Sequence, residues 1–438
     1  MRYLTLLSIT FTTFLVGAIP KTILAEQIQV NTALATPVML ADKKQTAYLR
    51  VGLRGFRFQK EKVAPINVAL VIDKSGSMQG EKIRRARDAA IMAVERMRTD
   101  DIMAVVTYSN NAEILLPATK TTDKESLKTA INGLSAGRST ALYDGVKKGA
   151  QEIRKFLDRN RVNRIVLVSD GLANVGPDSP KELGLLGASL GKEGIVVTTI
   201  GLGLSYNEDL MTQLAEKSNG NHAFVENAKD LARFFDSEFG DILAVIAQEV
   251  KVTITCADGI RPVRVLGKEA EIQGQQVQIA LNQLYSEHDH LLLLEIEVPP
   301  TKAGQDLMLA DVKVVYRNMV TDTTDRLNNQ VVAIFTTSPQ LVKKNTNLNV
   351  MIAVLKQQAF AKNELAITLR DLGKIREARQ VLLENAALLE DQAKKYDSDT
   401  LKKLSEINLN DATNLDNWER RRKIMRGNNY RGRNYQRY

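Results

Sequence analysis

Residues 65–247 alternate between short aliphatic or β-branched runs and longer segments with helical spacing, and this pattern constrains the fold more than any other feature. The run Val68–Ile72 is entirely apolar, as in a strand buried on both faces. We predict further strands at 102–108 and 164–169, helices at 83–97, 126–134 and 142–157, and a continued alternation through 183–190, 195–200 and 210–215. Strands that alternate with helices indicate crossover connections, so we expect an α/β fold with a mostly parallel sheet.

Oxygen-bearing side chains follow the strand ends, where parallel sheets place their ligand sites. The segment 73–77 follows the first strand, Asp170-Gly171 follows a later one, and 137–142 opens a helix. Carboxylate and hydroxyl oxygens suit Mg²⁺, Mn²⁺ or Ca²⁺ better than zinc. Because hydroxyls are neutral, an open coordination position would favour an incoming carboxylate from a partner. The candidate ligands are Asp73, Ser75, Ser77, Thr140 and Asp170.

The pattern Asp73-x-Ser75-x-Ser77, with Thr140 and Asp170, resembles the metal-ion-dependent adhesion site (MIDAS) of von Willebrand factor type A (VWA) domains. The resemblance covers the whole alternating block and keeps the family's order of strand ends. It implies a doubly wound, Rossmann-like sheet and one divalent cation, with Mg²⁺ favoured over Mn²⁺ or Ca²⁺. It also implies ligand binding without turnover, and therefore no catalytic residues. Lys74 occupies a variable position, where its charge would favour acidic partners.

Each part of the motif also has an ordinary structural explanation. A D-x-S-x-S string often forms a turn or a helix cap, Ser139 and Thr140 would serve as an N-cap, and Asp170-Gly171 forms a common turn. The interpretation as a metal site therefore depends on the presence of all three sequence segments at consecutive strand ends of one sheet. The alternative from another class is a metal-dependent hydrolase or phosphotransferase with Ser75 as nucleophile. The sequence does not support this alternative, because it contains no Walker-type lysine loop and no histidine near the candidate ligands.

Residues 26–64 and 248–338 are rich in strand signals on either side of the α/β domain, which we assign to 65–247. We predict that the two flanks form one antiparallel β-sandwich into which the α/β domain is inserted. Their order and composition are similar to those of bacterial proteins related to inter-alpha-trypsin inhibitor heavy chains and calcium-activated chloride channel regulators. His288 and His290 flank Asp289, and we interpret them as part of a polar loop rather than as metal ligands.

Two amphipathic helices are predicted at 349–372 and 374–395, around Gly373, and they would form a helical hairpin within 339–397. The run Leu369–Ala378 resembles a tetratricopeptide-type hairpin. One hairpin is too short for a stable solenoid. We therefore expect it to pack against the rest of the protein.

The net charge of +9 is concentrated at the two ends of the chain. Residues 419–438 hold eight Lys or Arg against one Glu, and residues 1–25 hold two basic residues and no acidic one, so 26–418 are balanced. We predict that 398–438 form a disordered, basic tail. Arginines between tyrosines suit polyanions, which makes an anionic surface, or RNA as in VWA-containing Ro-type proteins, the alternative partner.

The first 25 residues have the charged start, apolar stretch and small final residue of a secretory signal peptide cut after Ala25, with an uncleaved membrane anchor as the alternative. Because the rest of the sequence contains no run of eighteen apolar residues, we expect no membrane-spanning segment in the mature chain. The lone Cys256 cannot form an internal disulfide. We expect an exported, periplasmic or secreted, noncatalytic adhesion or scaffold module whose cation captures an acidic side chain of a protein partner. The exported location argues against nucleic acid.

Overall fold

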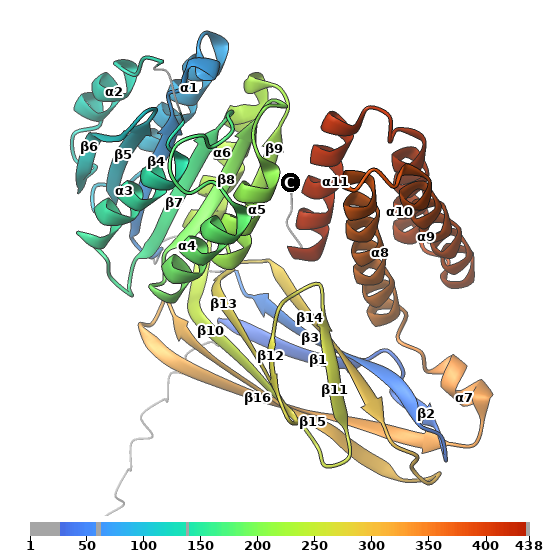
Figure 1. Ribbon diagram of the computed structural model, residues 1–438. Coiled ribbons are helices and arrows are strands. Elements are labelled where there is room, and N and C mark those ends of the chain that lie inside the picture. The colour runs from blue at the N-terminus through green and yellow to red at the C-terminus, as the bar shows by residue number, and fades with distance from the viewer. Residues whose placement is uncertain (1–26, 58–62, 137–139, 435–438) are drawn as a thin grey trace, which may run out of the picture.

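A computed structural model describes residues 27–57, 63–136 and 140–434, which form an α/β domain, a β-sandwich and a C-terminal helical part (Figure 1). The predicted signal peptide and Ser139 lie outside these residues. Among the described residues, no helix is long and apolar enough to cross a membrane.

Six strands in the order β6-β5-β4-β7-β8-β9 form the sheet of the α/β domain. Neighbouring strands are parallel except for the antiparallel edge pair β5 and β6. The strands are β4 (Ile66–Asp73), β5 (Ile102–Tyr108), β6 (Ala112–Lys120), β7 (Val162–Ser169), β8 (Val196–Leu202) and β9 (His222–Val225). The predicted α/β class with a doubly wound, mostly parallel sheet is confirmed, while β6 and β9 were not foreseen.

Helices cover both faces of this sheet, which explains the continuous apolar strands. Alternate residues of β4 point to opposite sides: Leu70 packs toward α1, α2 and α6, and Val71 packs toward α3, α4 and α5. The helices are α1 (Glu81–Arg96), α2 (Lys124–Asn132), α3 (Leu142–Arg154), α4 (Pro180–Lys192), α5 (Glu208–Lys217) and α6 (Leu231–Leu243), with the short 3-10 helices η2 (Gly76–Met78) and η3 (Ala228–Asp230).

The segments on either side of the α/β domain form a sandwich of two sheets, ordered β1-β3-β14-β11 and β12-β13-β10-β15-β16-β2. Their inner faces share one apolar core. The pairs are antiparallel except for the parallel pair of β16 and β2. The strands are β1 (Ile28–Leu34), β2 (Val38–Leu40), β3 (Gln45–Gly55), β10 (Val245–Cys256), β11 (Arg261–Leu266), β12 (Glu271–Gln273), β13 (Gln276–Tyr285), β14 (Asp289–Val298), β15 (Asp306–Asn318) and β16 (Thr323–Thr336).

One turn of the sandwich holds both ends of the inserted domain. The amide of Ser286 donates to the carbonyl of Ala244 over 2.8 Å, and the amide of Glu287 donates to that of Gly55 over 3.0 Å. A Cβ at Gly55 would lie 2.3 Å from the carbonyl oxygen of Tyr285, so glycine is required for this close approach. The entry to and the exit from the α/β domain are therefore clamped side by side.

A buried arginine links the α/β domain to the sandwich. Arg164 on β7 has no exposed surface, and its guanidinium forms an ion pair with Glu238 of α6 and contacts Gln283 and Tyr285 of β13. The Tyr285 hydroxyl lies 2.6 Å from Nη2. Burial alone would raise the pKa of Glu238, but the charge of Arg164 holds that pKa below its ordinary value. The Arg164 guanidinium is thus bound by its own domain on one side and by the sandwich on the other.

Replacing this arginine is expected to weaken the whole fold. Arg164→Met leaves the Glu238 carboxylate buried without its counter-charge, which costs about 3–5 kcal/mol. Urea unfolding followed by circular dichroism measures the loss. Arg233→Met on α6 is the matched control, because Arg233 is largely exposed and should change the free energy of unfolding by no more than about 0.5 kcal/mol. An equal effect of the two substitutions would contradict the proposed link.

The C-terminal part contains more helix than the predicted hairpin. After α7 (Pro339–Lys344), the long helices α8 (Leu348–Asp371) and α9 (Ile375–Tyr396) are followed by α10 (Asp399–Thr413) and α11 (Trp418–Asn434). A buried asparagine network crosses the four helices: the Asn385 amide donates to Asn363 over 3.0 Å and to Asn408 over 3.1 Å, and Asn363 donates to Asn429 over 3.4 Å. Such a satisfied network favours one arrangement of the helices.

The prediction of a disordered tail over 398–438 was wrong for residues 398–434, because α10 and α11 occupy residues 399–413 and 418–434; residues 435–438 lie outside the described part of the chain. Six of the eight basic residues of 419–438 form ion pairs with carboxylates of other elements or of the helix before them. For example, Arg422 contacts Glu208 and Asp209 of α5 and Asp371 of α8. The six are Arg420, Arg421, Arg422, Lys423, Arg426 and Arg433. The charge that suggested disorder instead attaches α11 to the body.

Helix α11 lies beside β9, the edge strand of the α/β sheet (Figure 1). The Lys423 ammonium donates to the carbonyl of Tyr206 over 2.7 Å, and the Tyr430 hydroxyl donates to that of Gly220 over 2.8 Å. A Cβ at Gly432 would lie 2.1 Å from the Phe360 ring, so this glycine allows α11 to pack closely on α8. The helix therefore covers a sheet edge that would otherwise be open.

Removing α11 should loosen that edge selectively. In a chain ending at residue 417, we expect faster amide hydrogen exchange in β9 and α5, because both lose their contacts with α11, and unchanged exchange in β4 at the sheet centre. A chain ending at residue 434 keeps the helix and serves as the control. Unchanged exchange in β9 after the larger truncation would show that α11 does not protect this edge.

Candidate metal centre

Three loops meet at the carboxyl edge of the α/β sheet. Asp73 is the last residue of β4 and precedes η2, and Asp170 directly follows β7. Thr140 lies two residues before the first residue of α3, Leu142. The amide of Ala141 donates to the carbonyl of Ser109 after β5 over 2.7 Å, which holds the Thr140 segment near the other two loops. The parallel order of the strands thus brings residues nearly a hundred positions apart to one site.

A chain of hydrogen bonds connects the first and last loops. Asp73 Oδ1 accepts from the amide of Ser75 over 2.8 Å, and the hydroxyls of Ser75 and Ser77 lie 3.1 Å apart. Ser77 Oγ then donates to Asp170 Oδ1 over 2.7 Å. Four of the five predicted ligands are therefore in direct contact.

Thr140 completes the group through the glycine that follows Asp170. A Cβ placed on Gly171 would lie 3.2 Å from Thr140 Oγ1 and 3.6 Å from Ser77 Oγ. The absence of a side chain at Gly171 thus leaves room between these two hydroxyls. The structure brings all five predicted residues together, and their role as metal ligands stays a prediction.

The two carboxylates have different surroundings. Asp73 is fully buried, and burial raises its pKa to about 6 despite hydrogen bonds from Ser75 and Ser169. Asp170 is also fully buried, but the ammonium of Lys82, in the first turn of α1, forms an ion pair with Oδ2. A buried carboxylate without a counter-charge favours a cation, so the Asp73 side of the site lacks the positive charge that Lys82 supplies to Asp170.

Three residues of the site were not foreseen. Ser169 Oγ donates to Asp73 Oδ2 over 2.8 Å, Lys82 pairs with Asp170, and Asn174 Oδ1 accepts from the amide of Thr140 over 3.0 Å. Ser169 could have been found, because it directly precedes Asp170 at a strand end. Lys82 and Asn174 carried no such signal, since their positions depend on how α1 and the loop after β7 fold back.

Other residues near the motif have structural roles. Lys74 forms an ion pair with Glu113 of β6 over 2.6 Å, so its charge is already balanced and does not support the expected attraction of acidic partners. Asp144 is exposed on α3, as expected of a solvated helix residue. His288 lies in the turn before β14 and His290 within that strand, far along the sequence from the metal centre.

The residues present fit a divalent cation of the hard, oxygen-preferring type. They offer two buried carboxylates and three hydroxyls, and a lysine ammonium already neutralises one carboxylate. Within the described residues, no group of three or more His, Cys, Asp or Glu side chains is placed to hold a metal ion, so the candidate site depends on its hydroxyls as well as its two carboxylates. Asp73, Ser75, Ser77, Thr140 and Asp170 would hold the ion, which would supply positive charge for an anionic ligand.

A second serine motif in the domain does not form a catalytic elbow. Residues Gly187–Gly191 match the G-x-S-x-G pattern, but they lie inside α4 rather than at a strand-to-helix turn. A Cβ on Gly187 would lie 2.5 Å from the carbonyl oxygen of Leu214, so this glycine permits close packing of α4 on α5. The motif is explained by helix packing.

The sheet order, the covering helices and the oxygen cluster define an α/β domain of the VWA class. Residues 67–237 match the von Willebrand factor type A domain family, and the chain therefore contains a VWA domain. Such domains are commonly metal-dependent protein-interaction modules and generally not enzymes.

Sequence relatives share this domain and extend beyond it. The chain is 30% identical over 213 residues to protein YfbK of Escherichia coli, a match that covers 48% of this chain and 37% of that protein. It is 27% identical over 169 residues to human inter-alpha-trypsin inhibitor heavy chain H3, covering 36% of this chain and 19% of that protein. The chain thus spans well under half the length of these relatives. The predicted similarity to inter-alpha-trypsin inhibitor heavy chains is confirmed, while its extension to the β-rich flanks stays a prediction.

Solved structures share the wider architecture. A von Willebrand factor type A protein from Catenulispora acidiphila superposes with a TM-score of 0.70 at 14% identity, covering 86% of this chain and 89% of that one. The ArnB paralog VWA2 from Sulfolobus acidocaldarius gives a TM-score of 0.64 at 18% identity, covering 94% and 99%. At these identities the likeness concerns the fold, which extends beyond the VWA domain.

Substitutions of Asp73 and of Lys82 should have opposite effects on the affinity of the site for a divalent cation. Asp73→Ala should abolish Mg²⁺ or Mn²⁺ binding, because it removes the carboxylate that has no counter-charge. Lys82→Met should tighten binding roughly two- to fivefold, because the ion no longer competes with a partly exposed ammonium for Asp170. Isothermal titration calorimetry measures both, with Lys181→Met on the exposed surface of α4 as the control. Weaker binding by Lys82→Met would mean that this lysine supports the site instead of competing with the metal.

Proposed function

We propose that this chain is a noncatalytic, metal-ion-dependent protein-binding module of the adhesion or scaffold type, which acts in the cell envelope or outside the cell. The observation that carries the proposal is the contact chain from Asp73 through Ser75 and Ser77 to Asp170, at the loop edge of a VWA domain. Mg²⁺ is the favoured ion, because carboxylate and hydroxyl oxygens are its preferred ligands.

The partner group is proposed to be an acidic side chain. The carboxylates of the site are fully buried, whereas Ser77 at its rim is exposed, so an ion held there would face outward. A carboxylate from a partner would complete its ligands and its charge balance. The specificity would then come from the protein surface around the rim.

The surroundings of the serines support binding over hydrolysis. The Ser75 and Ser77 hydroxyls contact each other, and Ser77 donates to Asp170. Nucleophilic serines need a neighbouring base. The described histidines lie elsewhere: His222 is buried on β9, 2.9 Å from Thr199 Oγ1, and His288 and His290 lie at the sandwich junction. A metal-dependent hydrolase is therefore not favoured.

The basic C-terminus does not support an anionic surface or RNA as the partner. Most of its Lys and Arg residues neutralise carboxylates of α5, α8 and α10 and the loop after β9. The proposed exported location is supported by the composition of residues 1–25. The partner is accordingly sought among envelope proteins.

A metal-dependent pull-down tests the proposal. The chain from residue 26 to 438 is immobilised, crosslinked to an envelope extract with Mg²⁺ or with EDTA, and compared with a cytosolic extract. We expect a partner only from the envelope extract with Mg²⁺, and its loss with Asp73→Ala. Asp144→Ala is the control, because it removes an exposed carboxylate of α3 outside the contact chain. Equal capture with Mg²⁺ and EDTA, or by Asp73→Ala, would overturn the proposal.

A further inference from the structure

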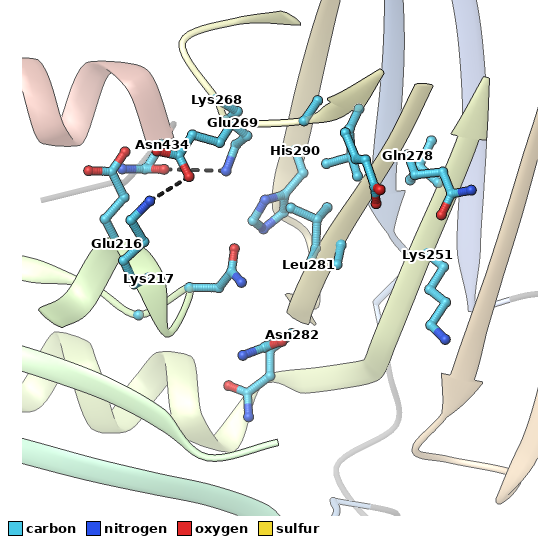
Figure 2. A pocket seen from close by; sticks show the side chains of 18 of the residues that line it. Glu216, Lys217, Lys251, Lys268, Glu269, Gln278, Leu281, Asn282, His290 and Asn434 are labelled. Atoms are coloured by element: carbon cyan, nitrogen blue, oxygen red, sulfur yellow. Dashed lines mark hydrogen bonds and ion pairs between the residues drawn. The ribbon is translucent and has the colours of Figure 1, made fainter. Parts of the chain in front are cut away.

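A cavity lies where the VWA domain, the sandwich and α11 meet, and its volume is about 700 Å³ (Figure 2). Lys217 at the end of α5, the segment Lys268–Glu271, strand β13, His290 and Asn434 contribute to its lining. The helices of the VWA domain run opposite to the strands, so the carboxyl ends of α4 and α5 lie at the other end of the sheet from Asp73 and Asp170. The cavity is therefore separate from the metal centre.

Two buried polar atoms of the lining lack a partner. Gln283 is 4% exposed, and its Oε1 accepts from Arg164, but its Nε2 has no hydrogen-bond partner among the described residues. His290 Nδ1 also has none within the described part of the chain, and Figure 2 shows the imidazole facing the space between Lys268 and Asn282. Buried polar groups are nearly always satisfied, so these two atoms are available to a molecule with polar atoms that enters the cavity.

The unpaired charge around the cavity is predominantly positive, because Glu271 is the one lining carboxylate without an ion pair to a residue that the structure describes. Glu216 is paired with Arg433, and Glu269 is paired with Lys217. Three lining lysines, in contrast, form no ion pair with any residue that the structure describes: they are Lys192, Lys251 and Lys268.

Lys268 is the innermost of these cations. Its ammonium donates to Asn434 Oδ1 over 3.3 Å, and burial lowers the pKa of Lys268 to about 8. The Lys268 ammonium is partly withdrawn from water, and the nearby Glu216 is already paired with Arg433, so an anion in the cavity would offset the cost of burial. Burial also lowers the pKa of His290 to about 3, so its neutral ring would contribute a hydrogen bond and not a charge.

We propose that this cavity binds a small organic anion, whose carboxylate or phosphate oxygens are bound by Lys268, Gln283 and His290. The volume lies within the range of about 300–1,000 Å³ that is common for small-molecule sites. The Arg164 guanidinium binds Gln283 Oε1 and so fixes the position of the side-chain amide. The orientation of the Gln283 Nε2 donor therefore depends on the contact between the two domains. The ligand would contact the VWA domain, the sandwich and α11 together.

Calorimetric titration of the full chain tests this site. Citrate represents the carboxylate class and glycerol 3-phosphate the phosphate class, each titrated at matched ionic strength without divalent cations, so that the metal centre does not contribute. We expect saturable binding of at least one of them, weakened at least tenfold by Lys268→Met. Lys302→Met, which removes an exposed lysine in the turn between β14 and β15, should leave binding unchanged.

His290→Phe is the second variant, since it keeps the ring volume and removes the unpartnered nitrogen. Gln283 is left intact because it also holds Arg164. If Lys268→Met does not fold by circular dichroism, loss of binding by His290→Phe decides in favour of the site. The absence of saturable binding by both anions below about 10 mM, or wild-type affinity in every folded variant, would overturn the proposal. Neither result would bear on metal-dependent partner capture.

Discussion

The structure depends on one fully buried charge, the guanidinium of Arg164. It starts on a central strand of the VWA sheet, pairs with Glu238 of the covering helix α6 and ends on Gln283 and Tyr285 of the sandwich. Desolvating such a group is unfavourable unless every donor finds an acceptor. Docking of the two domains supplies both acceptors of the Arg164 Nη2 group, so this end of the guanidinium is satisfied only when the domains are joined. Gln283 and Tyr285 also line the cavity proposed to bind an anion.

Much of the VWA domain and its metal centre could be predicted, because the signals are local. Apolar runs such as Val68–Ile72 show strands buried on both faces, and strand-end rules bring Asp73 and Asp170 together. The strands that were missed lack this signal: β6 is half-exposed and contains Pro117, and β9 has only four residues. Lys82 was missed because its pairing with Asp170 depends on the orientation of α1.

The C-terminus shows where composition misleads. Residues 419–438 contain eight basic residues, a composition that predicts mutual repulsion and disorder. That prediction fails when acidic residues elsewhere in the fold pair with them. Glu208 and Asp209, more than two hundred residues earlier, provide the opposite charge, and Tyr430 and Met425 provide apolar surface. Net charge per segment is therefore a weak guide when acidic and basic segments meet in the fold. Residues 26–418 carry no net charge, yet their carboxylates pair with the basic residues of α11, and the chain as a whole keeps its net charge of +9.

The clamp of Gly55 and Ala244 by the Ser286–His288 turn has a consequence for the order of folding. Strands β3 and β14 pair with each other although the whole α/β domain lies between them in the sequence. If that intervening segment were a flexible chain, bringing the two strands together would cost the entropy of closing a very long loop. A folded VWA domain holds its own two ends together and replaces that loop with a short, rigid connection. The inserted domain, once folded, thus lowers the entropy cost of closing the sandwich around it.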